Sequence, residues 1–187
     1  CSTMNTRRGI IRCSNLRKRS SYLRLLKQTR AGEVQRLKAG VYARPEALAD
    51  VVLDIPSIIA GGVLCMYSAW DFHHLTVQVP PAHCVAVKRG RKVVLPAYPP
   101  IKLYWVSESI HALGIMEASA GNKKILVYDK ERSVCDALRA RNKIGTETSS
   151  EILRNYLASP DKNLTKLCHY ARKLRIYTLL KHYLEFC

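Results

Sequence analysis

The sequence predicts an α+β protein in which an N-terminal winged helix-turn-helix precedes a larger mixed α+β domain that ends in helices. Three observations predict this class: a charge asymmetry along the chain, β-branched and aromatic segments in its middle, and helical patterns toward its C-terminus. With 187 residues and 48% hydrophobic content, the chain can bury a sizeable core. Its formal net charge of +17 points to a polyanionic partner such as nucleic acid, an anionic membrane or an acidic protein.

Basic residues are concentrated at the N-terminus. Residues 1–48 hold 12 Lys and Arg against two Glu, a net charge of +10, whereas the other 139 residues hold 19 basic and 12 acidic side chains. We therefore predict two domains, 1–48 and 49–187. The chain opens with Cys1, so either Met4 is the start or a native N-terminal piece is missing, and the sequence leaves both possibilities open.

The first domain is expected to contain two short helices. Ser14 can cap a helix over 15–19, and Ser20 or Ser21 can cap a second helix that runs to about Arg30 and is ended by Gly32. On a helical wheel the second helix is amphipathic. Its polar side holds Ser20, Arg24, Lys27 and Gln28, and its apolar side holds Tyr22, Leu23, Leu25 and Leu26.

A β-hairpin is predicted after this helix. Val34 and Leu37 precede a turn over 38–40, and Val41 and Tyr42 follow it. An amphipathic helix followed by a tight basic hairpin is the outline of a winged helix-turn-helix, in which only a clear first helix before Gly9 is lacking.

The second domain is expected to begin near Asp50 and to alternate between apolar and β-rich segments. We predict a buried helix over 63–74, and strands over 84–88, 93–95, 101–106 and 124–128. Asp129 is a candidate N-cap for a helix through Arg141. Further helices are predicted at about 148–158, 164–173 and 176–186.

The amphipathic helix is the strongest functional signal, because a helix fits the major groove of DNA and its polar residues can reach base edges. The predicted DNA-binding residues are Ser20, Ser21, Arg24, Lys27 and Gln28 on the helix, and Arg36 and Lys38 on the wing. Secondary contacts to phosphate or to an acidic partner are predicted for Arg17, Lys18, Arg19, Lys88, Arg89, Arg91 and Lys92. The alternative is a solvated helix face and a solvated hairpin tip on a basic protein.

No pattern indicates an enzyme, a cofactor or a metal site. The chain has no G-x-S-x-G motif and no glycine-rich phosphate loop. Asp129, Glu131 and Asp136 form the closest acidic cluster, and their place at a helix start favours capping. Asp71 and His74 share a face but lack a third ligand. We expect a protein with no catalytic residues.

Cysteine usage and hydropathy indicate a cytoplasmic protein. The seven cysteines form no CxxC pair, and Cys65, Cys84 and Cys135 lie in apolar runs, which favours reduced, buried thiols over zinc ligands or a disulfide framework. The longest uncharged stretch, 55–70, is shorter than a spanning helix and contains Pro56 and a Gly pair. No membrane partner is predicted.

Several stretches in sequence order resemble one family. The stretch over 33–43, EVQRLKAGVYA, is followed by GVLCMYSA at 62–69 and by His73. Three later stretches agree: YPPIKL at 98–103, VYDKERSVCD at 127–136 with RNKIG at 141–145, and the C-terminal region from Tyr170 to Glu185. Together they resemble the AbiEi family of type IV antitoxins, also described as transcriptional regulators of viral defence systems.

The resemblance implies a bacterial repressor with a winged helix that binds double-stranded promoter DNA and a C-terminal antitoxin domain. That domain would counter an AbiEii-like toxin, which resembles nucleotidyltransferases, without a stable complex. The chain departs from the family in its short or absent first helix and in about two added residues near Arg30. An alternative from another class is a basic interaction module that binds an acidic protein or RNA.

Overall fold

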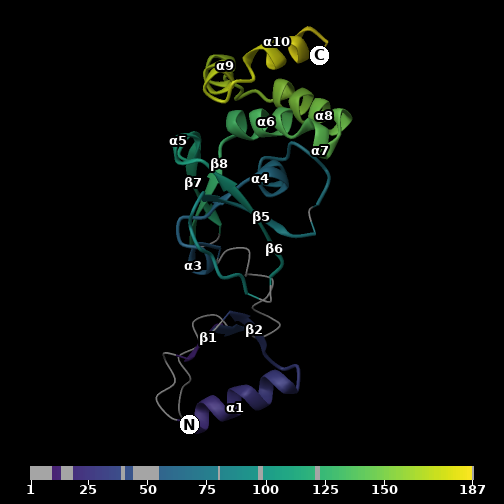
Figure 1. Ribbon diagram of the computed structural model, residues 1–187. Coiled ribbons are helices and arrows are strands. Elements are labelled where there is room, and N and C mark those ends of the chain that lie inside the picture. Colours follow the sequence, from purple (N-terminus) through teal and green to yellow (C-terminus); the bar gives the residue numbers. More distant parts are fainter. Residues whose placement is uncertain are drawn as a thin grey trace. The chain divides into compact units, whose positions relative to one another are not determined.

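The computed structural model describes residues 10–13, 19–38, 41–43, 55–79, 81–96, 99–120 and 123–186 (Figure 1). The chain divides into two compact units, one of residues 1–60 with 92–101 and one of residues 61–91 with 102–187. The boundary predicted between residues 48 and 49 falls outside the described ranges. Within those ranges, the helices are too short or too polar to span a bilayer.

The first unit contains a three-stranded antiparallel sheet and one long helix. Strand β1 (Ile10–Arg12) precedes helix α1 (Arg19–Arg30), which leads into strands β2 (Gln35–Lys38) and β3 (Val41–Ala43). The sheet order is β1-β3-β2, and a bulge interrupts the β2–β3 pairing between Arg36 and Lys38. The predicted hairpin is confirmed. A short helix, α3 (Ile55–Ile58), also belongs to this unit.

Helix α1 ends where the sequence predicts. The Gly32 amide donates to the Thr29 carbonyl at 3.2 Å, and the Glu33 amide donates to the Gln28 carbonyl at 3.0 Å. These bonds form a Schellman motif that needs a left-handed residue, and Gly32 supplies it with φ +76°.

The start of α1 differs from the prediction. The helix begins at Arg19, so Ser20 and Ser21 lie inside it and are not its N-cap. In a run of short polar and basic residues, several positions can cap a helix about equally well, and the sequence does not choose among them. The helix predicted over 15–19 falls largely outside the described residues.

The second unit is built on a five-stranded mixed sheet. Its strands are β4 (Val63–Leu64), β5 (His83–Lys88), β6 (Ile101–Val106), β7 (Ile115–Ala120) and β8 (Lys123–Tyr128), in the order β6-β5-β4-β8-β7. Strand β4 runs parallel to β8 and antiparallel to β5. Strands β7 and β8 pair along their whole length, from Ile115 opposite Tyr128 to Ala120 opposite Lys123.

The helices of this unit gather mainly after the sheet strands in sequence. They are α4 (Met66–Phe72), α5 (Glu108–His111), α6 (Lys130–Arg139), α7 (Arg141–Ile144), α8 (Thr146–Ala158), α9 (Leu164–Lys173) and α10 (Tyr177–Glu185). Figure 1 shows α6 to α10 together on one side of the sheet. Their core includes the fully buried Trp70, Leu138, Leu153 and Leu180. The α+β class with C-terminal helices is confirmed.

Two element predictions in this unit are wrong. Val63 and Leu64 form a buried strand before α4, although we predicted one helix over 63–74, because a short apolar run is compatible with either structure. The strand predicted over 93–95 is absent, and Val94 is 82% exposed there. A β-branched residue forms a strand only where a partner and a buried face exist.

Candidate nucleic-acid interface

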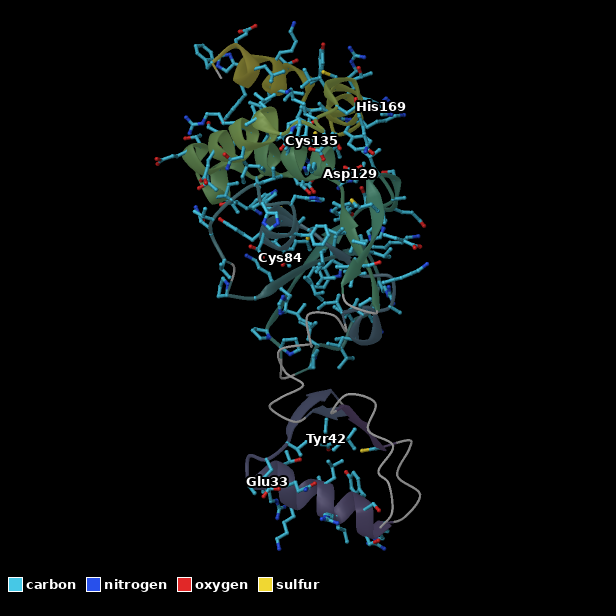
Figure 2. The ribbon with its side chains drawn as sticks, turned by 180° about the vertical axis from the view of Figure 1, so that it is seen from behind. Glu33, Tyr42, Cys84, Asp129, Cys135 and His169 are labelled. Atoms are coloured by element: carbon cyan, nitrogen blue, oxygen red, sulfur yellow. The ribbon has the colours of Figure 1, made fainter. Side chains whose placement is uncertain are left out.

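Helix α1 packs on its sheet through a narrow face. Leu25 is fully buried and forms a cluster with Ile11, Val34 and Tyr42, one from each neighbouring segment. Figure 2 shows Tyr42 between the sheet and α1. The small sheet therefore fixes which side of the helix faces solvent.

The opposite face of α1 is a basic surface. Its exposed side chains are Arg19, Ser20, Leu23, Arg24, Lys27 and Arg30, and the helix contains no carboxylate. Twelve residues at about 1.5 Å each make this surface about 18 Å long. Four of the six are cations, and none of them forms an ion pair with another described residue. They are Arg19, Arg24, Lys27 and Arg30. We call these six residues the α1 basic face.

The structure brings only part of the predicted helix site together. Ser20, Arg24 and Lys27 lie on the α1 basic face, whereas Ser21 and Gln28 are half-buried. The Oε1 atom of Gln28 is buried and has no hydrogen-bond partner among the described residues. Gln28 therefore lies partly on the packed side of the helix, although its prediction placed it on the polar side.

The predicted apolar side of the helix is wrong at Leu23. It was expected beside Leu25 in the core, yet it is 57% exposed within the α1 basic face. The two residues are 200° apart on a helical wheel, since each residue advances about 100°. Arg30, absent from the predicted site, lies three residues after Lys27 on the same face, and that spacing was the available signal.

The remaining N-terminal predictions are not placed. Arg36 and Lys38 lie in β2 by their backbone, and their side chains lie outside what the structure describes. Arg17 and Lys18 fall outside the described residues altogether. Of the predicted secondary contacts near the helix, Arg19 is the one on the α1 basic face.

The basic segment 88–92 begins at the last residue of β5 and is partly neutralised. Lys88 forms an ion pair with Glu108 at 2.7 Å, and this hydrogen bond lowers the pKa of Glu108 from its ordinary value. Gly90 has φ +86°, a left-handed backbone conformation that explains a glycine at this turn. Arg89, Arg91 and Lys92 are exposed. The segment therefore offers a weaker positive surface than four unpaired cations would.

Two buried carboxylates at the start of α6, Asp129 and Glu131, belong to a polar network. The Asp129 carboxylate accepts the Arg132 amide at 2.8 Å as the N-cap of α6, and it also accepts the Tyr170 hydroxyl at 2.9 Å. Glu131 accepts the Tyr156 hydroxyl at 3.0 Å. The Lys166 ammonium joins both carboxylates, at 2.9 Å from Asp129 and 3.4 Å from Glu131. We call five of these side chains the α6 network: Asp129, Glu131, Tyr156, Lys166 and Tyr170.

The electrostatics of the α6 network match a structural role. Burial opposes the charged form of Lys166, but its hydrogen bond to Asp129 and the charge of Glu131 raise the pKa of the ammonium group above its usual value. Burial and the hydrogen bond to Asp129 raise the pKa of Tyr170 to about 12. Lysine and tyrosine thus stay protonated and donate to the two carboxylates. The predicted capping role of Asp129 is confirmed.

A second buried ion pair lies on the same helix. Arg132 is 1% exposed, and its Nε atom donates to both carboxylate oxygens of Asp136 at 3.1 and 3.2 Å. The same guanidinium donates to the carbonyls of Ile110 and Leu113 and stacks 4.4 Å from the Tyr128 ring centroid. Gly114 makes room for it, because a Cβ there would lie 2.7 Å from the Arg132 Cβ.

Neither buried cluster forms a metal centre. Within the described residues no group of three or more His, Cys, Asp or Glu side chains is arranged to hold a metal ion. The carboxylates of the α6 network already accept hydrogen bonds from lysine and tyrosine. Cys65, Cys84 and Cys135 are buried and free, as the sequence predicts.

The chain was also compared with known proteins. No protein-family model and no curated protein sequence matches it.

Proposed function

We propose that this chain is a double-stranded DNA-binding transcriptional regulator that acts as the antitoxin of a type IV toxin–antitoxin system. The observation that carries the DNA-binding part is the α1 basic face, with four exposed cations and no carboxylate on the helix. A helix of this width enters the major groove, and the cations release counterions from phosphates.

The surroundings of α1 support a winged-helix mode of binding. The hairpin β2–β3 follows the helix directly, and β1 pairs with β3, so the helix stands on a sheet that can present it as a rigid unit. Arg36 and Lys38 on the hairpin would act as the wing, reaching phosphate or the minor groove. Arg24 and Lys27 would lie closest to the bases or their phosphates.

The antitoxin part of the proposal rests on the resemblance to the AbiEi family and on the separation into two units. The second unit would oppose an AbiEii-like toxin, and the first would repress the shared promoter. We propose no catalytic step, because the carboxylates closest together in the sequence are held in the α6 network and in the Arg132–Asp136 pair.

Duplex binding tests the α1 basic face directly. We would measure binding to a labelled duplex from the protein's own upstream region and to a scrambled duplex, each at two salt concentrations. Arg24→Ala should weaken binding to the upstream duplex by about 5- to 150-fold if Arg24 reads a base, and should lower the salt slope by about one if it contacts a phosphate.

The matched control removes a charge far from α1 in sequence. Lys143 is exposed on α7, and Lys143→Ala should leave the affinity within about twofold. Equal losses for the two variants, or binding that does not respond to salt, would refute the DNA-binding proposal. Equal salt-sensitive binding to both duplexes would show a non-specific polycation.

A second experiment separates the two activities. The chain would be co-expressed with the toxin from a neighbouring reading frame of nucleotidyltransferase pattern, and growth would be followed together with a promoter reporter. Arg24→Ala should lose repression and keep neutralisation. Loss of both together would contradict a division of labour between the two units.

A further inference from the structure

A cavity of about 380 Å³ lies between helices α8 and α10 in the second unit. It is lined by Ser150, Arg154, His182, Tyr183 and Phe186. Its volume falls within the range of about 300–1,000 Å³ that small-molecule sites occupy. Neither the predicted DNA-binding residues nor the α6 network contribute to it.

Helical spacing places two pairs of side chains across this cavity. Ser150 and Arg154 are four residues apart on α8, and His182 and Phe186 are four residues apart at the end of α10, so each pair shares one helix face. One wall therefore supplies a guanidinium and a hydroxyl. The other wall supplies two aromatic rings, with the Tyr183 hydroxyl beside them.

Three polar groups of the cavity can donate hydrogen bonds to a ligand. Among the described residues, Arg154 forms no ion pair, and the hydroxyls of Ser150 and Tyr183 form no hydrogen bond with a side chain or backbone group. No carboxylate lines the cavity. A guanidinium with a nearby hydroxyl fits the geometry of a phosphate, which accepts several donors at once.

The aromatic wall adds a flat apolar surface. The rings of His182 and Phe186 meet edge to face, with centroids 4.9 Å apart and an interplanar angle of 70°. Phe186 is 78% exposed, so one face of its ring is open to a ligand. Bases stack on such rings in proteins that bind single-stranded nucleic acid. A simple carboxylate would use Arg154 and leave this wall uncovered.

We propose that this cavity binds a nucleoside phosphate, with its phosphate on Arg154 and Ser150 and its base stacked against Phe186. Two sources share this chemistry: a free mononucleotide and the phosphate-bearing end nucleotide of a single strand. The site shares no residue with the proposed DNA interface on α1, so either proposal can fail without the other.

Calorimetric titration of the full chain tests the site. The probes are AMP, adenosine, inorganic phosphate, and a tetranucleotide with or without a 5′-phosphate. AMP should bind at least tenfold more tightly than adenosine or phosphate alone, because both walls are used only when base and phosphate are joined. Tighter binding of the phosphorylated tetranucleotide than of AMP would identify a strand end as the source, and equal binding would identify the free nucleotide.

Three variants assign the contacts. Arg154→Ala should weaken AMP binding at least tenfold, and Phe186→Ala should weaken it about fivefold or more through lost stacking. Lys181 is exposed on α10 but does not line the cavity, so Lys181→Ala should change the affinity less than twofold. Arg24→Ala on α1 should leave AMP binding unchanged.

Three outcomes would overturn the proposal. They are a dissociation constant for AMP weaker than about 1 mM, equal affinities for AMP and adenosine, and equal effects of Arg154→Ala and Lys181→Ala. Arg154 and Phe186 are exposed, so the variants should keep the wild-type thermal transition, which would be recorded in parallel.

Discussion

The two units of this protein use charged residues in opposite ways. On α1 the cations are exposed and form no ion pair with another described residue, and the helix covers a core cluster of four buried residues. In the second unit, Arg132 and Lys166 meet carboxylates inside or at the edge of a core cluster with thirteen buried residues. The same side-chain types thus stabilise the fold where carboxylates satisfy them, and on α1 they form the surface that we propose binds DNA.

The largest effect on stability is expected from a substitution of Arg132, which tests the structural role of paired charges in the second unit. Arg132→Ala leaves the buried Asp136 carboxylate without its main partner, and we expect it to destabilise the second unit by about 3–5 kcal/mol. Urea unfolding followed by tryptophan fluorescence measures the effect, because Trp70 and Trp105 both lie in the second unit.

Arg139 provides the control for that change. Its guanidinium lies 3.6 Å from Asp136 but is 39% exposed, so Arg139→Ala should cost less than about 1 kcal/mol. Replacing Arg132 and Asp136 together by Met and Leu should recover much of the loss. Similar costs for Arg132→Ala and Arg139→Ala would show that the buried pair is not a stability determinant.

A substitution of Leu25 tests how far the small core under α1 stabilises the first unit. Leu25→Ala removes the fully buried contact between the helix and its sheet, and large-to-small core changes cost about 2–5 kcal/mol. Amide hydrogen exchange over 19–30 should accelerate, and DNA binding should fall. The tryptophan transition of the second unit should not move.

The neighbouring Leu23 provides the control for Leu25→Ala. It is 57% exposed, so Leu23→Ala should change stability by less than about 0.5 kcal/mol. If Leu25→Ala instead shifts the tryptophan transition as much as it accelerates exchange in α1, the two units unfold as one.

A smaller effect is expected from pH, through the histidines of the second unit. Burial lowers the pKa of His111 from its ordinary value of 6.5, and the charges of Lys88 and Arg132 lower it further. The unfolded chain therefore binds more protons than the folded one as pH falls below about 6.5, so stability decreases with acidification. His73 and His83 shift in the same direction through burial.

Urea unfolding at pH 7, 6 and 5 checks this prediction. The wild type should lose stability over that range, and His111→Gln should lose less, because the glutamine does not titrate. An identical pH dependence in the two proteins would contradict a role for His111.

Elements with a local signal could be predicted from the sequence. The glycine end of α1, the hairpin β2–β3, the Asp129 cap and helix α9 all follow from short-range patterns that need no distant partner. Strand β7 could not be predicted in this way, because its Ala and Ser residues favour a strand only once β8 pairs with them.

The sequence predicted which cations belong to the candidate site better than it predicted which side chains of the helix face solvent. Arg24 and Lys27 were identified from their charge, whereas the outward position of Leu23 and the half-buried position of Gln28 depend on where the small sheet packs. A helical wheel with mixed residues allows several apolar faces. The cavity between α8 and α10 has no linear signature, since its two walls are about 30 residues apart in the chain.

The α6 network also has an evolutionary consequence. Lys166 forms ion pairs with both Asp129 and Glu131. Asp129 also accepts hydrogen bonds from the Arg132 amide and the Tyr170 hydroxyl. A single substitution at Lys166 would leave two buried carboxylates without their shared cation, and one at Asp129 would remove a helix cap along with an ion pair. We therefore expect descendants of this chain to change these positions jointly or to retain them all.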